Sequence, residues 1–315
     1  MSATATDAGR ETSIGFLAGV GAFSIWGVMP LFYKLLGHVP PTEVLAHRVF
    51  WSLPALVALA AVMAKWSDIK RLFLSPRCVA ILALTTLLIL INWGLFIWSI
   101  ANERLLDASL GYFINPLMSV AIGAAFLGEK ISGAQKIAIG LAGVAIAQEL
   151  VTLGRFPWIS LTLSTSFATY GYLRKTINAD AVSGHFVEIA LIAPIALGII
   201  LFWQTSGAAG FGAFDDAAST AALLIAAGPF TVAPLILFTM GARRLPLSTI
   251  GLLQYGAPSL QFLIGVAYGE PFTLGRAVTF GLIWAGLAVF SIDLWRRDRA
   301  QKLAMGPMAA AGDGA

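Results

Sequence analysis

The chain has 315 residues, of which 58% are hydrophobic and only 11% are charged, and its formal net charge is +4. A soluble domain carries roughly 25% charged residues, so this composition excludes a protein with a solvated surface. The single cysteine, Cys78, excludes an internal disulfide, and the chain has no HExxH metal motif and no GxxxxGK[ST] nucleotide loop. We therefore predict no cofactor and no bound metal.

The apolar residues come in runs of about 18 or more, the length needed to cross the hydrocarbon layer of a membrane. The alternation typical of barrel strands is absent. We therefore expect an all-α integral membrane protein with disordered ends at 1–12 and 300–315. In chain order, ten transmembrane helices are predicted near 13–34, 42–64, 77–101, 105–127, 132–153, 156–174, 183–203, 219–241, 246–268 and 273–295.

The distribution of basic residues predicts the orientation of these spans. If the N-terminus is cytoplasmic, most Lys and Arg residues between spans fall on the cytoplasmic side, as the positive-inside rule requires. The acidic loop around Asp215 and Asp216 then lies outside. We expect both termini to be cytoplasmic.

The two halves of the chain resemble each other at an offset of 140 residues. Pro54 and Pro194 both fall in the middle of a predicted span, and the motif Tyr112–Pro116 recurs as Tyr255–Pro258. Each half contains five spans, an odd number, so the second half enters the membrane from the opposite side. This predicts an inverted repeat, an arrangement common in secondary transporters. The two five-helix repeats are expected at 13–153 and 156–295.

Three ionisable residues lie where the second span begins, in the stretch TEVLAHRVFW. Glu43 and His47 are four residues apart and share a helix face, and Arg48 lies about 9 Å into the span. Ionisable groups inside a membrane are expensive and are functional by default, which favours a substrate, proton or gating site. The alternative is an interfacial ion pair that only orients the helix.

Glu188 corresponds to Arg48 at the same offset of 140 residues. The inversion would place the two residues in opposite halves of the bilayer, about 12 Å apart in height, which disfavours a direct salt bridge. We interpret them as one gate residue on each side. The alternative for Glu188 is a residue at a helix end that reaches out to the cytoplasmic surface.

Further polar and aromatic residues lie inside predicted spans. A polar side chain in a span needs a partner on another helix or in water, and a lining of this kind suits an organic molecule better than a bare ion. The alternative for each residue is interhelical packing. The candidate substrate-binding residues of this type are Asn92, Trp93, Tyr112, Asn115, Gln254 and Tyr255.

The motifs HVPPTEVLAHRVFWS, INWGLFIW, ASLGYFINPLMSV and RRLPLSTIGLLQYGAPSLQFLIGVAYGEPF carry a resemblance to a known group. The chain resembles the RarD proteins, a branch of the EamA family in the drug/metabolite transporter superfamily. The resemblance implies ten helices in a bacterial inner membrane and transport of small molecules, often described as export, with a label that links RarD proteins to chloramphenicol sensitivity. The polar signature of the family falls here on Glu43, His47, Arg48, Asn92, Tyr112 and Asn115.

The hypothesis is a secondary active transporter that exports small organic metabolites or drugs by alternating access. His47 or Glu43 is a candidate carrier of a coupling proton, because His titrates near neutral pH. The expected partners are a small organic solute, protons and the lipid bilayer, without nucleic acid. One alternative is a signalling or scaffold protein without transport. Another is a lipid-modifying membrane enzyme, for which the nucleophile–base constellation is missing.

Overall fold

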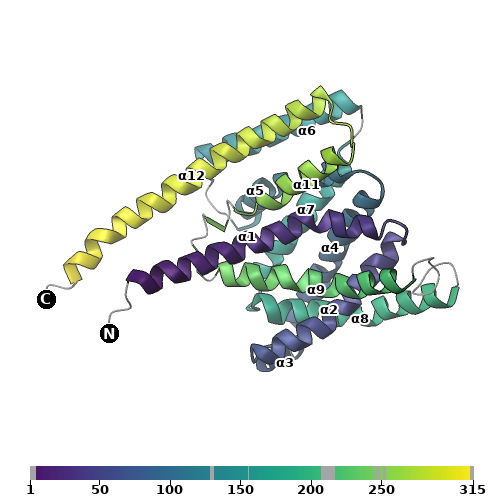
Figure 1. Ribbon diagram of the computed structural model, residues 1–315. Helices are drawn as coiled ribbons and strands as arrows, with labels where there is room; N and C mark the ends of the chain where they lie inside the picture. The colour runs from purple at the N-terminus through teal and green to yellow at the C-terminus, as the bar shows by residue number, and fades with distance from the viewer. Residues whose placement is uncertain are drawn as a thin grey trace.

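The computed structural model describes residues 5–127, 131–154, 156–206, 217–242, 244–245, 249–250 and 253–312. Within these ranges all regular secondary structure is helical (Figure 1). The acidic loop at 215–216 and parts of the ninth predicted span, 246–248 and 251–252, lie outside the described residues. The helices are α1 Ala5–Leu35, α2 Pro41–Val62, α3 Trp66–Phe73, α4 Pro76–Ala101, α5 Leu105–Leu127, α6 Gly133–Leu153, α7 Trp158–Lys175, α8 Ala181–Ser206, α9 Ala217–Ala242, α11 Gly256–Ala267 and α12 Leu274–Gly312.

Eight helices of the described chain, namely α1, α2, α4, α5, α6, α8, α9 and α12, are long and apolar enough to cross a membrane. Two of the ten predicted spans do not meet the same criteria. The helix α7 has 18 residues but is rich in Ser and Thr, and α11 has 12 residues. The chain is a multi-pass membrane protein.

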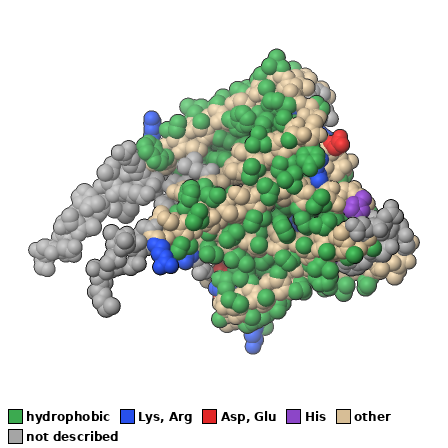
Figure 2. Space-filling model, in the orientation of Figure 1, with side chains coloured by type: hydrophobic (Ala, Val, Ile, Leu, Met, Phe, Trp, Pro, Cys, Tyr) green, Lys and Arg blue, Asp and Glu red, His purple; other side chains and the backbone are tan. Residues whose placement is uncertain are grey.

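The surface agrees with a lipid environment. Figure 2 shows hydrophobic side chains over most of the visible face, with Lys, Arg, Asp and Glu visible mainly near its edges. Many large apolar side chains are exposed along the helices, for example Leu17, Leu87, Ile195 and Phe202. In water such a surface would drive aggregation, whereas in a bilayer it is the normal exterior.

Local signals explain where several helices begin and end. Pro41 and Pro76 each lie in the first turn of a helix, where their missing N–H costs no hydrogen bond. Ser132 and Gln135 form a reciprocal capping box at the start of α6. This helix ends at Gly154, whose φ of 61° suits a residue without a side chain.

The short helix α3 differs from the sequence prediction, which treated this segment as a loop. Its apolar residues Ile69 and Leu72 are buried, while Lys70 and Arg71 are exposed, so the helix is amphipathic. Eight residues are too few for a spanning pattern to appear in the hydropathy. The helical ends also differ from the prediction, because α1 begins at Ala5 and α12 continues to Gly312.

Two ends of the bundle are distinguished here by the residues that they contain. The His38 side holds the connection between α1 and α2, where His38 Nε2 lies 2.9 Å from Thr220 Oγ1. The Lys65 side holds the connection between α2 and α3, where Lys65 Nζ lies 3.4 Å from Asp180 Oδ2. The start of α1 and the end of α12 emerge on the same side of the bundle (Figure 1).

The helices form a bundle in which α2 packs against α8 and α9, and α6 and α12 run side by side along one edge (Figure 1). On the His38 side, Glu270 accepts hydrogen bonds from the backbone N–H of Leu105 at 2.6 Å and of Leu106 at 2.8 Å. Arg276 Nη2 also donates to Asp107 Oδ1 at 2.8 Å. The start of α5 is therefore joined to the connection between α11 and α12 and to α12 itself.

Candidate functional site

The centre of the candidate site is the guanidinium of Arg48, which is 3% exposed. Its Nε donates to Thr231 Oγ1 on α9 at 3.0 Å. Its central carbon lies 4.0 Å from the ring centroid of Trp93 on α4 and 5.6 Å from that of Tyr33 on α1. Three other helices thus surround the one charged group that α2 places deep in its apolar run.

The hydrogen bonds of Arg48 are incomplete. Its Nη1 is buried and has no hydrogen-bond partner among the described residues, and no carboxylate in that part of the chain lies within 4.0 Å of the guanidinium. The aromatic face of Trp93 attracts the cation but supplies no acceptor. A buried charge whose donors are unpaired is costly, so the arrangement favours an additional acceptor from a ligand or from water.

Glu43 and His47 lie beside Arg48 on α2, and both are buried. His47 Nε2 lies 3.8 Å from Glu43 Oε1. Trp51 Nε1 donates to His47 Nδ1 at 3.1 Å. Because an indole N–H can only donate, Nδ1 carries no proton and the imidazole is neutral in this conformation.

The amide of Asn92 connects three helices. Its Nδ2 donates to the carbonyl of Leu163 at 2.9 Å and to Ser166 Oγ at 3.1 Å, both on α7, and its Oδ1 accepts from the hydroxyl of Tyr112 on α5 at 3.0 Å. All three bonds are made within the protein. Of the two roles that the sequence allowed, solute binding and interhelical packing, this favours packing.

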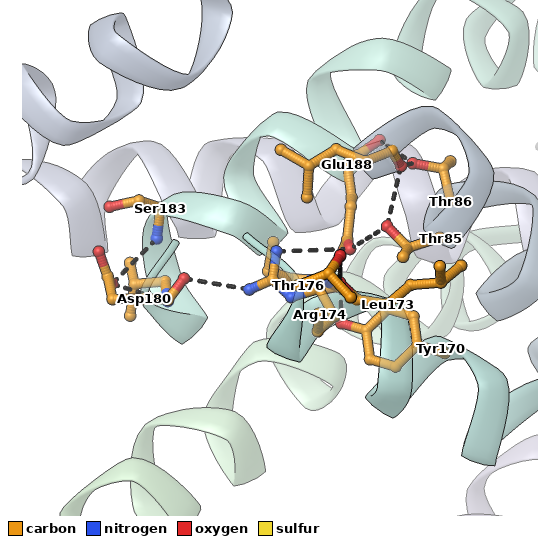
Figure 3. Close-up of polar contacts among 12 residues, drawn as sticks. Thr85, Thr86, Tyr170, Leu173, Arg174, Thr176, Asp180, Ser183 and Glu188 are labelled. Atoms are coloured by element: carbon orange, nitrogen blue, oxygen red, sulfur yellow. Dashed lines mark hydrogen bonds and ion pairs between the residues drawn. The ribbon is translucent and has the colours of Figure 1, made fainter. Parts of the chain in front are cut away.

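Glu188 is fully buried on α8 and lies in a second polar cluster, shown in Figure 3. Its Oε1 accepts from Thr85 Oγ1 at 2.7 Å and lies 3.6 Å from Arg174 Nη1. Its Oε2 lies 3.2 Å from the hydroxyl of Tyr170 and 3.1 Å from His185 Nδ1. The side chain thus points into the bundle and not outward to the surface.

No hydrogen bond or ion pair among the described residues joins Arg48 to Glu188, but Trp93 contacts both clusters. Its ring centroid lies 4.0 Å from the Arg48 guanidinium carbon and 5.7 Å from the centroid of the His185 ring, in an edge-to-face arrangement. His185 in turn contacts Glu188. The two residues that the predicted repeat would pair are therefore linked through a tryptophan and a histidine.

The remaining candidate residues are Asn115 on α5, and Gln254 and Tyr255 at the start of α11. Asn115 has a buried Oδ1 without a hydrogen-bond partner in the described residues. Gln254 lies just before α11, and Tyr255 caps that helix and packs against a core cluster that includes Phe113 and Phe280. No hydrogen bond or ion pair joins these residues to the Arg48 cluster within the described part of the chain.

Several residues of the two clusters were not predicted from sequence: Tyr33, Thr85, Tyr170, Arg174, His185 and Thr231. One of them carried a usable signal. His185 precedes Glu188 by three residues in an apolar helix, so the two share a face. The others are common residue types whose position follows only from long-range packing.

Comparison with known proteins places the chain in a family. The model of the EamA-like transporter family matches residues 13–148. Protein RarD of Streptomyces exfoliatus is 44% identical over 96% of each chain, and an uncharacterized transporter of Vibrio cholerae is 42% identical over 94% of this chain and 97% of its own. One solved crystal structure, 20% identical, covers 90% of this chain and 98% of its own with a TM-score of 0.56, which supports the fold alone.

The apolar helices and these likenesses define a membrane transporter of the drug/metabolite superfamily. Within that class, the chain belongs to the RarD branch of the EamA-like transporter family.

Proposed function

We propose that this protein is a secondary active transporter that exports small organic metabolites or drugs by alternating access. The observation that carries the proposal is Arg48, a buried guanidinium whose Nη1 has no partner among the described residues and which has an aromatic ring on one face. In a membrane helix such a group is retained where it meets a solute or water. The family of this chain supplies the transporter class, and Arg48 supplies the position at which a solute binds.

The solute class follows from the groups around Arg48. A guanidinium with an unpaired donor binds a carboxylate, carbonyl or nitro oxygen, and the rings of Trp93 and Tyr33 favour a planar, partly apolar body. Glu43 and His47 border this position on the same helix. Asn115, Gln254 and Tyr255 would line the path at other stages of the transport cycle, as would Tyr112 if its bond to Asn92 opens.

Helix packing supports two inverted repeats, at 13–153 and 156–295. In such a repeat α1 corresponds to α7, α2 to α8, α4 to α9, α5 to α11 and α6 to α12. The contacts follow this correspondence: α2 packs on α8, α5 on α11 and α6 on α12, while α1 contacts α9 and α11 as α7 contacts α4 and α5. We infer ten transmembrane helices, with α7 and the segment containing α11 as the two more polar or shorter members.

The Lys65 side is assigned to the cytoplasm of a bacterial cell, so both termini are cytoplasmic and the protein lies in the inner membrane. At that end Lys65 and Arg174 both contact Asp180, and Arg71 pairs with Asp68. Arg244 pairs there with Glu11 near the start of α1, and the positive-inside rule favours this orientation.

Flux measured with the purified protein tests the proposal. Proteoliposomes are loaded with a bacterial metabolite extract and with chloramphenicol, because one Pseudomonas aeruginosa relative is named for chloramphenicol sensitivity. Mass spectrometry then identifies solutes that leave faster than from protein-free vesicles. We expect Arg48→Ala and Arg48→Lys to abolish most of this flux, and the control Arg71→Ala, at an exposed position on α3, to leave it unchanged. Absence of protein-dependent flux, or full flux with both Arg48 variants, would overturn the proposal.

A further inference from the structure

The Glu188 cluster contains more protonatable groups than a structural ion pair requires. Its carboxylate is 0% exposed, and the side chains of Thr85, Tyr170 and Arg174 converge on it from α4 and α7 (Figure 3). His185 contacts it from α8 itself. His185 Nδ1 and Glu188 Oε2 lie 3.1 Å apart. A hydrogen bond at this distance needs one proton between them, which the imidazole supplies either as its neutral Nδ1–H tautomer or as an imidazolium.

The hydroxyl of Thr85 can serve two protonation states of Glu188. Its single proton faces two acceptors, Glu188 Oε1 at 2.7 Å and the carbonyl of Leu82 at 3.0 Å. With an ionised carboxylate, the hydroxyl donates to Glu188. With a protonated carboxyl group, the hydroxyl accepts that proton and donates to Leu82 instead, so neither state leaves a buried donor unpaired.

Arg174 is the positive group that a proton would replace. Its Nη1 lies 3.6 Å from Glu188 Oε1, and its Nη2 donates to the carbonyl of Asp180 at 3.0 Å, on the Lys65 side. The guanidinium reaches this position because residue 184 is glycine: a Cβ at Gly184 would overlap with Nη1 and Nη2 of Arg174. The guanidinium therefore passes directly over the backbone of α8 to meet Glu188.

The polar contacts of Glu188 described above involve none of the other charged groups on the helices that pack here. On α2 they are Glu43, His47 and Arg48, and the last is separated from His185 by Trp93. On α3, Asp68 pairs with Arg71 and Lys65, while Lys65 also reaches Asp180, and Lys70 belongs to the last turn of that helix. The remaining titratable side chains described on the neighbouring helices are Arg77 and Cys78 at the start of α4, and Tyr172 near the end of α7.

We infer that Glu188 and His185 form a proton-binding site and that a proton and the Arg174 guanidinium alternate as the positive partner of Glu188. When Arg174 withdraws toward Asp180, one proton adds to the carboxylate and no other bond is made or broken. The inference rests on the proposed transport function and names its coupling ion. Trp93 contacts both His185 and Arg48, so a solute bound at Arg48 would affect proton binding at this site through that ring.

Infrared spectroscopy of the protein in lipid nanodiscs tests the site without any solute. If a proton replaces Arg174 at Glu188, lowering the pH should add the carbonyl band of a protonated carboxyl group. The band should be missing in Glu188→Gln and retained in Glu149→Gln, a control at a buried glutamate that Thr279 hydrogen-bonds. A band of equal size in Glu188→Gln would overturn the inference.

A glycine pair tests the role of Arg174. Gly184→Ala should displace the guanidinium, which is a flexible side-chain end. A nearby positive charge favours the ionised form of a carboxyl group, so its removal should move the midpoint of the band up by about one pH unit. The control Gly198→Ala lies on the same helix, where a Cβ has open space, and should leave the midpoint unchanged. An unchanged midpoint in Gly184→Ala would overturn the alternation, and this test remains valid if Glu188→Gln does not fold.

Flux in the vesicles described above separates this inference from the proposed function. If solute leaves in a protein-dependent way but a pH gradient has no effect on its rate, transport stands and the assignment of the proton as its coupling ion is overturned. If no solute moves, the proposed function fails, while the infrared titration still decides whether Glu188 takes up a proton. Gradient-driven flux that Glu188→Gln abolishes supports both.

Discussion

Gly228 of α9 lies directly against the backbone of Trp51 on α2, so a Cβ at position 228 would overlap with the carbonyl group of Trp51. The same close approach brings Thr231, one helical turn further, to the Nε of Arg48. Ser52 Oγ also lies 3.4 Å from the carbonyl of Gly228. The crossing of α2 and α9 thus sets the position of the Arg48 cluster.

Replacing Gly228 by Ala should push these two helices apart. Because the overlapping atoms belong to the backbone, they cannot rotate away, and we expect a loss of stability of about 1–3 kcal/mol, as overpacking usually costs. Thermal unfolding in detergent, followed by tryptophan fluorescence, measures the change. Gly140→Ala, where a Cβ on α6 has open space, is the control and should unfold like the wild type. An unaltered midpoint for Gly228→Ala would contradict the close packing.

Trp93 should contribute to solute binding through Arg48. A desolvated cation over an aromatic ring gains about 2 kcal/mol, so Trp93→Ala should weaken solute binding by roughly ten- to thirtyfold, and Trp93→Phe by less. Equilibrium binding of a solute identified in the flux assay measures this effect. Trp295→Ala, at an exposed position near the end of the apolar part of α12, should bind like the wild type. Equal affinity for Trp93→Ala would exclude a binding role for the ring.

Asp180 should make stability depend on pH only under acidic conditions. Burial by itself raises the pKa of Asp180, but hydrogen bonds from Ser183 and the nearby Lys65 outweigh it and hold the pKa below its ordinary value. A carboxyl group with a lowered folded-state pKa stabilises the fold above its unfolded pKa of about 4, and this contribution is lost as pH falls through the folded-state value.

Unfolding midpoints of Asp180 variants test this. Asp180 accepts the N–H groups of Val182 and Ser183 at the start of α8, so Asp180→Ala should lose about 1 kcal/mol, the typical value of a helix cap. Asp180→Asn should lose less, since asparagine also caps. We expect the difference from the wild type to stay constant between about pH 5 and pH 8 and to shrink below about pH 4. A difference that changes across the neutral range would refute this assignment.

Asn92 variants distinguish a role of the amide in helix packing from a role in contacting the solute. Removing its amide leaves the Tyr112 hydroxyl without its acceptor and takes one of two side-chain donors from the Leu163 carbonyl, so Asn92→Ala should cost about 1–3 kcal/mol of stability. Tyr112→Phe removes one partner of the same network and should cost less. If Asn92→Ala folds as stably as the wild type but loses solute flux, the amide lines the transport path instead of joining the helices.

The apolar runs predicted most of the fold, because a spanning helix must be long and apolar along its whole length. The segment of α3 escaped prediction because its eight residues alternate buried Ile69 and Leu72 with charged neighbours. Arg48 and Glu188 were found as site candidates for the same reason, since a charge in an apolar run is conspicuous. Their partners Thr231 and Thr85 could not be found, because the sequence does not show whether a threonine in a span faces lipid, another helix or a charge.

Glu270 uses both carboxylate oxygens to hold the first two backbone N–H groups of α5, which stand 165 and 164 residues away in the sequence. A helix usually leaves those groups to water or to its own preceding residues. The short stretch between α11 and α12 therefore has a fixed length, because one inserted residue would carry the carboxylate out of reach. Among variants of this chain, insertions there should be rarer than in the other connections of the bundle, and the amides of Leu105 and Leu106 should exchange their hydrogens with deuterated solvent slowly.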